Sequence, residues 1–430
     1  MNKLLLILIF LVAYAGIVFK REKAHFFVYG AILFFLLINA ITFIDIPYLL
    51  NYNVLGIFLG TSVLSNLFSK SGMPDFMVAS IADKRYPVWF VYLLICIITG
   101  LISSVVENVA TIMIMAPVAM KLAEQYNKNP VPLVVSMSVA SNLQGCATMI
   151  GDSPSIILAM EANMNFNDFF YMPASKLSLS SGRPGIFFFV QIGALASFFI
   201  LYLFFKRERE RMEPFSEKKK IKTYIPSFLI VLMMISLAVG SFFSNEFTYF
   251  PAIICLFYAA LGLICFFKKY KNDKTLFSDM INWKIFFILV GIFILVGTLK
   301  KAGFIEDVAL FLQKTGGDSP FVLYNVIVWG SVFISSFIDN IPYTMAMVSG
   351  VQVLSANLSL NPYIFLFGLL LGTCIGGNIT PIGASCNITG VGILEKKGYK
   401  ISFKDFFKIG LPFTILAVLA STLSMWLVYN

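Results

Sequence analysis

Three acidic side chains, Glu107, Asp152 and Asp339, lie in or beside segments that are otherwise apolar. An ionisable group at the middle of a bilayer costs about 2.5 to 3.5 kcal/mol on insertion scales, so it is a functional candidate by default. A carboxyl group held away from water takes up a proton readily, and its ionised form attracts cations. These residues therefore predict proton or sodium chemistry. The alternative is that they are protonated and only cap helices.

The acidic residues belong to motifs that occur twice at one constant offset. The segment Gly145–Ser155 matches the segment Gly377–Asn387. Two separate motifs that keep the same offset indicate an internal duplication. The pairs at this offset (380 − 148 = 232) are Glu107-Asn108 with Asp339-Asn340, Thr148 with Thr380, Ile150 with Ile382, Gly151 with Gly383 and Ser153 with Ser385.

The composition identifies the medium in which these motifs operate. The chain of 430 residues is 59% apolar and 13% charged, whereas soluble domains carry about 25% charged residues. Many uncharged runs are long enough to cross a bilayer core of about 30 Å as helix. We therefore predict an all-α polytopic membrane protein of the inner or plasma membrane. The net charge of +10 resides in short loops, so it is read as a topology signal rather than a nucleic-acid footprint.

The predicted architecture is two inverted-topology repeats with about ten transmembrane helices, two re-entrant hairpins and two broken helices. With both termini outside, the inner segments hold 26 of the 32 Lys and Arg and the outer ones hold 6, as the positive-inside rule requires. Five spans per half invert the second half, which is a signature of secondary transporters. The predicted parts are a first repeat 1–206 (hairpin 88–124, broken helix 131–163), a solvated cytoplasmic linker 207–223, and a second repeat 224–430 (hairpin 321–357, broken helix 361–394).

Prolines and capping residues indicate that half-helices begin inside the membrane. Pro154 and Pro342 suit a first helical turn, and Asp152 or Ser153, and Asn340, are the expected N-caps. Four half-helix N-termini would then meet near the midplane, where each holds about half a positive charge and attracts an anion or an oxygen-rich solute. The acidic residues would balance these dipoles. Backbone groups at the helix breaks need hydrogen-bond partners. The polar side chains that can supply them are Asn142, Gln144, Thr148, Thr373, Asn378, Thr380 and Thr389.

Four motifs together resemble the ion transporter superfamily: Glu107-Asn108-Val109-Ala110-Thr111, Gly151-Asp152-Ser153-Pro154-Ser155, Asp339-Asn340-Ile341-Pro342 and Gly376–Asn387. The likeness is greatest to arsenite permeases, NhaD-type sodium/proton antiporters and pink-eyed-dilution P-type permeases. Divalent anion:sodium symporters and citrate transporter-like proteins are related. Ser155 stands where the family usually has asparagine, and Cys386 stands where alanine is common.

The resemblance implies a homodimer in which each subunit has a scaffold part and a transport part that moves like an elevator. It places substrate and coupling ion between the hairpin tips and the broken helices. A sodium ion would bind near Asn108, Asp152, Asn340 and Asn387. Neither a catalytic residue nor a cofactor is expected. The complete predicted set of binding residues is Glu107, Asn108, Thr111, Thr148, Asp152, Ser153, Ser155, Asp339, Asn340, Thr344, Asn378, Thr380, Ser385 and Asn387.

The leading functional hypothesis is efflux of an arsenite-like metalloid, coupled to protons or sodium. The alternatives are a sodium/proton antiporter, a symporter of di- or tricarboxylates or other anions, and, from another class, a passive channel. Acidic hairpin tips argue against a sodium-coupled dicarboxylate carrier. Signature motifs of zinc proteases, serine hydrolases and P-loop ATPases are missing from the sequence, which argues against an enzyme. An arsenical pump would require a separate soluble ATPase as partner.

Overall fold

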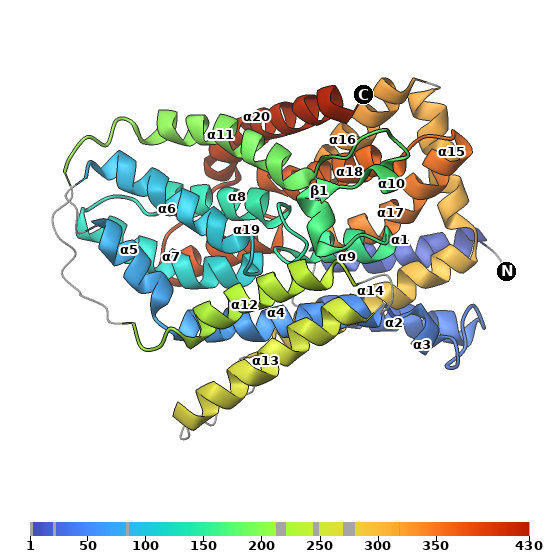
Figure 1. Ribbon diagram of the computed structural model, residues 1–430, viewed down its shortest axis with the longest axis horizontal. Coiled ribbons are helices and arrows are strands. Elements are labelled where there is room, and N and C mark those ends of the chain that lie inside the picture. The colour runs from blue at the N-terminus through green and yellow to red at the C-terminus, as the bar shows by residue number, and fades with distance from the viewer. Residues whose placement is uncertain are drawn as a thin grey trace.

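The computed structural model describes residues 3–19, 23–82, 86–211, 221–243, 249–269, 280–317 and 319–429, and these are almost entirely helical (Figure 1). The described elements of the first half are α1 (Lys3–Phe19), α2 (Ala24–Leu37), α3 (Ile46–Leu49), α4 (Tyr52–Lys70), α5 (Met73–Ala82), α6 (Val88–Ser103), α7 (Asn108–Gln125), α8 (Val131–Gly145), α9 (Ser153–Glu161), η2 (Phe166–Phe169), β1 (Tyr171–Met172), α10 (Ala174–Leu177), β2 (Arg183–Pro184) and α11 (Ile186–Phe205). Those of the second half are α12 (Ile225–Gly240), α13 (Phe250–Lys269), α14 (Trp283–Lys301), α15 (Phe304–Gly316), α16 (Pro320–Ser335), α17 (Asn340–Asn357), α18 (Pro362–Gly376), η3 (Gly377–Ile379), α19 (Ser385–Lys396) and α20 (Phe403–Tyr429).

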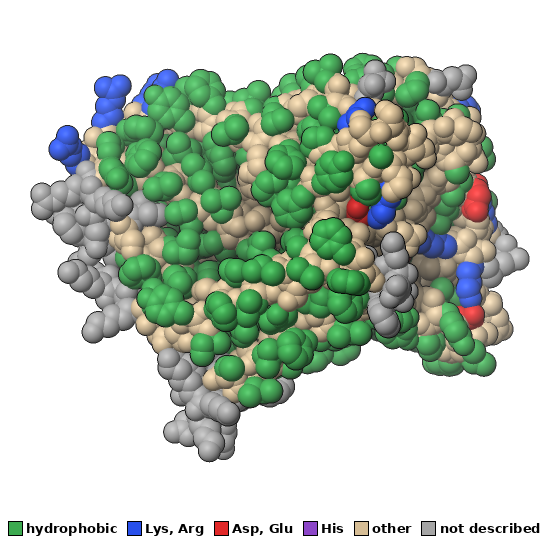
Figure 2. Space-filling model, in the orientation of Figure 1, with side chains coloured by type: hydrophobic (Ala, Val, Ile, Leu, Met, Phe, Trp, Pro, Cys, Tyr) green, Lys and Arg blue, Asp and Glu red, His purple; other side chains and the backbone are tan. Residues whose placement is uncertain are grey.

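Several of these helices are long and apolar enough to cross a membrane. Among the described residues, α11, α14, α18 together with η3, and α20 meet that criterion singly, and five shorter apolar helices accompany them. Hydrophobic side chains cover most of the face in Figure 2, with Lys and Arg at its left end and charges of both signs at its right. The all-α polytopic membrane class is thus confirmed. The expected number of about ten spans and the orientation of the termini stay predictions.

The helices of the two halves pack in matching pairs. Helix α4 packs against α13 of the other half, and α14 packs in the same way against α2. Helix α9 contacts α17 as α19 contacts α7, while α6 contacts α8 as α16 contacts α18. Helices α11 and α20, which occupy equivalent places in the two halves, pack against each other along the upper edge of Figure 1. Each half therefore supplies packing partners for the other.

The two helices that carry the repeated motif are interrupted. Helix α8 ends at Gly145 and α9 begins at Ser153, while α18 and η3 end at Ile379 and α19 begins at Ser385. The segments 104–107 and 336–339 form tight connections within the pairs α6–α7 and α16–α17. Four helix N-termini therefore lie inside the protein.

Two helices, α5 and α15, have no counterpart among the predicted spans. Each follows a glycine in the left-handed backbone region, Gly72 (φ 75°) and Gly303 (φ 74°), a conformation that glycine adopts without steric penalty. Helix α5 is bent by 54° from α4. Helix α15 buries Ile305, Ala309 and Leu312 and exposes its other face. Both helices combine polar and apolar residues, so neither forms the uninterrupted apolar run that predicts a membrane span.

The start of the predicted linker 207–223 contacts α6, and residues 212–220 lie outside the described part. The carbonyl groups of Glu208 and Glu210 accept hydrogen bonds from the backbone N–H groups of Trp89 and Val88, at 3.0 and 2.9 Å. Their carboxylates lie 2.8 and 3.2 Å from Lys128 Nζ. The first N–H groups of a helix have no partner within it, so the linker supplies acceptors to α6.

Close approach of α4 and α13 yields a testable requirement for glycine. A Cβ atom on Gly60 would lie 2.5 Å from the carbonyl carbon of Cys255, whereas a Cβ atom on Gly30 would meet nothing within 4 Å. We expect Gly60→Ala to lower the free energy of unfolding by about 1 to 3 kcal/mol, because the helices must separate. Gly30→Ala, the matched control, should be neutral or slightly stabilising. Thermal unfolding in detergent measures both, and equal midpoints would contradict the predicted contact.

Candidate functional site

The hydrogen-bond network at the centre of the protein converges on Asn142, a buried residue of α8. Its Nδ2 atom donates to two groups of the second half, the carbonyl oxygen of Cys374 at 2.6 Å and Oδ1 of Asn378 at 3.0 Å. Its Oδ1 atom accepts from Nδ2 of Asn108 at 3.2 Å, and the side-chain amide of Asn340 lies 3.5 Å from the same oxygen. One amide thus joins both interrupted helices and both connections.

Serine hydroxyl groups hold the amides at the tips of the two helix pairs. In the first half, Ser103 Oγ donates to Oδ1 of Asn108 at 2.6 Å and accepts from Ser141 Oγ at 2.7 Å. In the second half, Ser335 Oγ lies 2.8 Å from the amide of Asn340 and donates to the carbonyl oxygen of Thr373 at 2.6 Å. Ser103 and Ser335 are separated by the repeat offset (335 − 103 = 232). The contact between serine and amide is therefore made twice, whereas the second partner is a hydroxyl group in the first half and a backbone carbonyl oxygen in the second.

The interrupted segments also bind to the tips in matching fashion. The hydroxyl group of Thr148 donates to the carbonyl oxygen of Ser104, and that of Thr380 donates to the carbonyl oxygen of Ser336. A Cβ atom on Gly145 would lie 2.3 Å from Oδ1 of Asn108. Glycine at this position is therefore what lets the tip amide approach the end of α8.

Carboxylates cap three of the four internal helix N-termini. Each accepts a hydrogen bond from a backbone N–H group in the first turn of its helix, which satisfies a donor that the helix cannot. The pairs are Glu107 Oε2 with the N–H of Ala110 at 3.0 Å in α7, Asp152 Oδ1 with the N–H of Ser155 at 3.0 Å in α9, and Asp339 Oδ1 with the N–H of Ile341 at 3.2 Å in α17.

The fourth N-terminus, that of α19, obtains its carboxylate from another helix. Its N-cap is Ala384, which has no capping side chain, but the hydroxyl of Ser385 donates to Oδ2 of Asp339 at 2.6 Å. The prediction of Asn340 as an N-cap is wrong, because α17 begins at Asn340 and Asp339 occupies the capping position. The Asn340 amide is instead directed at Ser335.

Asp152 has the most enclosed carboxylate of the three. It is 4% exposed. Its Oδ1 atom accepts from the Ser155 hydroxyl at 2.5 Å, and its Oδ2 atom accepts from the Cys374 thiol at 3.2 Å. Asn387, which occupies the position of Ser155 in the other half, donates instead to the carbonyl oxygens of Gly377 and Thr380, at 2.9 and 3.0 Å. The Ser155 hydroxyl lies 3.5 Å from the carbonyl oxygen of Gly145, the equivalent of Gly377, and makes its shorter contact with the carboxylate.

The predicted binding residues fall into two groups by contact. Thr111 and Thr344 are buried and bond to carbonyl oxygens of Val106 and Asn340 at 3.1 and 2.8 Å, so their hydroxyls serve the local backbone. Ser153 is the buried first residue of α9. The remaining members make the contacts described above with the Asn142 network, with a helix N-terminus, or with carbonyl oxygens of the tips and interrupted segments: Glu107, Asn108, Thr148, Asp152, Ser155, Asp339, Asn340, Asn378, Thr380, Ser385 and Asn387.

Several residues of the network were absent from the predicted set. The sequence predicts Asn142 only as a hydrogen-bond partner for backbone groups, and it does not single out the tip serines or Cys374. The repeat offset is a signal that would have found the serines, since it pairs Ser103-Ser104 with Ser335-Ser336. The contact of Cys374 with Asp152 joins different halves, so it depends on the tertiary fold.

A groove of about 260 Å³ leads to the Asp339–Ser385 pair. It begins beside the exposed residues Asn282 and Lys284 and follows α14 to the tips of α7 and α17 and to α19. One carboxylate of the site is thus reached from a cavity, whereas Asp152 is enclosed. Among the described residues no group of three or more His, Cys, Asp or Glu is arranged to hold a metal ion. The oxygen ligands gathered here suit a proton or a monovalent cation.

The central amide supports a prediction about stability. Asn142→Leu should lower the free energy of unfolding by about 2 to 5 kcal/mol, because it leaves several buried partners without a hydrogen bond. Asn325→Leu is the matched control, since the Asn325 side chain donates to the carbonyl oxygen of Phe321 in its own helix, at 2.8 Å, and to no other group in the described part of the chain. Thermal unfolding in detergent compares the two. A control variant as unstable as Asn142→Leu would contradict the central role of Asn142.

Comparison with known proteins identifies the family to which this chain belongs. The uncharacterized transporter Rv2685 of Mycobacterium tuberculosis is 28% identical over 389 residues, covering 88% of this chain and 87% of that protein. The P protein of Mus musculus is 25% identical over 446 residues, covering 86% of this chain and 53% of that protein. The crystal structure of the Alcanivorax borkumensis YdaH transporter shares the fold, with a TM-score of 0.50 and 13% identity over 87% of this chain and 84% of that one.

The profile of a protein family described as citrate transporter matches residues 11–367. Rv2685 and the similar protein slr0753 of Synechocystis are both named as uncharacterized transporters. Because the match covers well over half of the 430 residues, the chain belongs to the citrate transporter family and is a multi-pass membrane transporter.

Proposed function

We propose that this protein is an elevator-type secondary active transporter that moves a small inorganic solute in exchange for, or together with, protons or sodium. Efflux of an arsenite-like metalloid is the first candidate. The observation that carries the proposal is the placement of three carboxylates, Glu107, Asp152 and Asp339, on the helix N-termini that surround the central network.

The charge balance at these N-termini supports cation coupling. Four helix N-termini contribute together about two positive charges, whereas three ionised carboxylates contribute three negative ones. Neither Lys nor Arg takes part in the described contacts of the central network. The ionised site therefore has an excess of negative charge, which a bound proton or sodium ion would neutralise. An uncharged solute such as arsenous acid would then bind without further compensation.

The matched packing of the two halves supports the elevator mechanism. We propose that α1–α4 and α12–α14 form a scaffold, and that the segments from α5 to α11 and from α15 to α20 form the transport part. The pairs α4–α13 and α2–α14 lie within the proposed scaffold, and the pairs α6–α8, α16–α18 and α11–α20 lie within the transport part. Each of the two proposed inverted repeats contributes to both parts. A homodimer in the plasma membrane, with its termini outside, completes the proposal.

A second candidate function is symport of a di- or tricarboxylate, favoured by the description of the family as citrate transporter. A polyanion would meet the negative site only after cations had neutralised the carboxylates, so this function also requires coupling ions. Sodium/proton antiport needs the same carboxylates and no further solute. A channel would show flux that ignores both gradients, and an arsenical pump would depend on a soluble ATPase.

The deciding experiment uses proteoliposomes that contain a pH-sensitive dye. Sodium, lithium, arsenite and succinate are added singly against a preset pH gradient. Proton movement with arsenite alone would support the first candidate, and movement with sodium or lithium alone would establish an antiporter. Succinate uptake that needs sodium, with no proton movement, would favour the second candidate, with sodium rather than the proton as the coupling ion.

Substitution of Asp152 tests its role in coupling. Asparagine can cap α9 as aspartate does, so Asp152→Asn should keep the unfolding temperature. It cannot take up a proton, so proton movement driven by the transported solute should be abolished in the dye assay. Normal coupling in this variant would remove Asp152 from the mechanism.

The two tip carboxylates should differ in importance. Asp339 accepts hydrogen bonds from the first turn of α17 and from the Ser385 hydroxyl at the start of α19, whereas Glu107 accepts one from the first turn of α7. We therefore expect Asp339→Asn to reduce the transport rate more than Glu107→Gln does. Initial rates in matched proteoliposomes measure this, and equal losses would count against the proposed ranking.

A further inference from the structure

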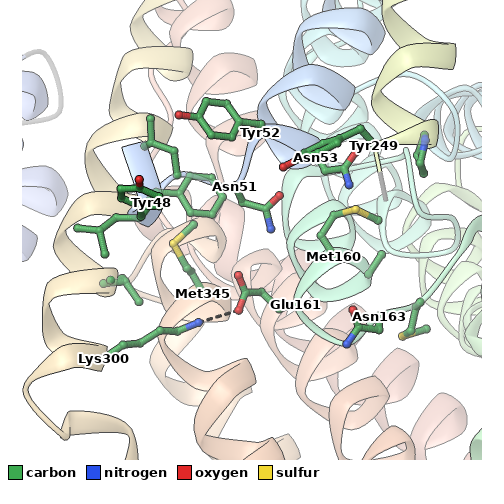
Figure 3. Close-up of a pocket in the computed structure, with 18 of the residues that line it drawn as sticks. Tyr48, Asn51, Tyr52, Asn53, Met160, Glu161, Asn163, Tyr249, Lys300 and Met345 are labelled. Atoms are coloured by element: carbon green, nitrogen blue, oxygen red, sulfur yellow. Dashed lines mark hydrogen bonds and ion pairs between the residues drawn. The ribbon is translucent and has the colours of Figure 1, made fainter. Parts of the chain in front are cut away.

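Helix α14 lines two separate cavities, one toward each of its ends. Residues from Lys284 to Ile292 border the groove that reaches Asp339 and Ser385. Residues from Phe293 to Lys301 border a second cavity of about 710 Å³ (Figure 3). The second cavity is lined by neither Asp339 nor Ser385. Of these two cavities, the one toward the Lys284 end of α14 reaches the candidate site.

The second cavity is suited to a small hydrophilic solute. Around it, Figure 3 shows Asn51, Asn53 and Asn163 together with the phenol groups of Tyr48 and Tyr249. Amide and phenol groups both donate and accept hydrogen bonds, so they can replace the hydration of a hydroxylated molecule. This lining comes from α3, α4 and the segments that flank α9 and α13.

Two of the residues that line this cavity belong to helices of the candidate site. Met345 of α17 and Ala159 of α9 line it. Met345 follows Thr344 and is buried, and α9 is the helix that Asp152 caps. A movement of α9 and α17 along α14 would therefore connect the cavity with the site.

An ion pair joins the elements that such a movement must separate. Lys300 Nζ of α14 lies 2.7 Å from Glu161 Oε2 at the end of α9, and both side chains are largely buried. Gln352 of α17 donates to the carbonyl oxygen of Glu161 at 3.0 Å. The next residue, Lys301, lies 2.5 Å from Asp45, which precedes α3. The first pair thus links the proposed scaffold to the proposed transport part, whereas the second lies within the scaffold.

We infer that the second cavity is the vestibule through which solute enters or leaves at the Lys300 end, and that the Lys300–Glu161 ion pair is the latch that keeps it closed from the site. This inference rests on the proposed elevator function. Opening the vestibule separates α9 from α14 and breaks the pair. Loss of the pair should shift the population toward the open state, because an interaction present in one state stabilises that state only.

Accessibility of one introduced cysteine, compared with the parent protein, tests the latch without any assumption about the solute. Met345→Cys reports on the inner limit of the vestibule, and Thr389→Cys reports on the groove at the Lys284 end. A membrane-impermeant thiol reagent is applied from each side of oriented vesicles, with the parent protein as baseline. Adding Glu161→Gln should raise labelling at position 345 from the Lys300 side several-fold and lower labelling at position 389 from the other side.

The neighbouring ion pair provides the matched control. Asp45→Asn breaks a contact of the same type on the same helix end and should leave labelling at both positions unchanged. Unchanged labelling in the Glu161→Gln variant, or an equal response to Asp45→Asn, would overturn the latch. If labelling responds as expected but no solute moves protons in the dye assay, the latch stands and the proposed coupling fails.

A cross-link provides an independent measurement. A short, cleavable, bifunctional thiol reagent is used to join Glu161→Cys to Lys300→Cys. The cross-link should arrest solute flux and prevent labelling at position 345 from the Lys300 side. Cleavage of the cross-link should restore both. The same treatment of Asp45→Cys with Lys301→Cys should not arrest flux, and full flux through the cross-linked Glu161–Lys300 protein would contradict the proposal.

Discussion

Backbone groups freed by broken helices inside an apolar protein are the constraint on which this structure depends. Two long helices stop and restart near the centre, and two helix pairs turn there, so N–H and C=O groups that would otherwise bond within a helix need other partners. Asn142, Ser335 and the repeated threonines Thr148 and Thr380 supply them. These polar side chains are buried because the helix ends they satisfy are buried.

The carboxylates answer the same constraint and add chemistry to it. An N-cap needs only a hydrogen-bond acceptor, and serine or asparagine would serve. Glu107, Asp152 and Asp339 instead bring negative charge, and Asp339 binds two helix N-termini at once. Because the charge exceeds what the helix dipoles balance, capping and cation binding become one function in the proposed mechanism. A change in the bound cation would alter the interactions that hold the helix ends.

Helix α14 shows how one element can serve both sides of a transporter. Its length borders a groove at one end and a wider cavity at the other, and the candidate site is reached from only one of them. Its two consecutive lysines form ion pairs with different partners, one close to the interrupted helix and one near α3. A rigid helix with different contacts at its two ends can stay fixed while the proposed transport part moves along it.

The sequence by itself determined the all-α polytopic membrane class, because the apolar runs and the scarcity of charge leave no soluble alternative. It also indicated the duplication and the acidic residues, because a constant offset and a charge in an apolar run are local properties. The tertiary structure alone decided that Asn142 is the centre, that Asp339 rather than Asn340 caps α17, and that Cys374 contacts Asp152. It also decided the positions of α5 and α15, whose mixed polarity gives no distinct pattern. These features depend on contacts between residues more than 200 positions apart or on one-residue differences in where a helix begins, and no local pattern encodes either.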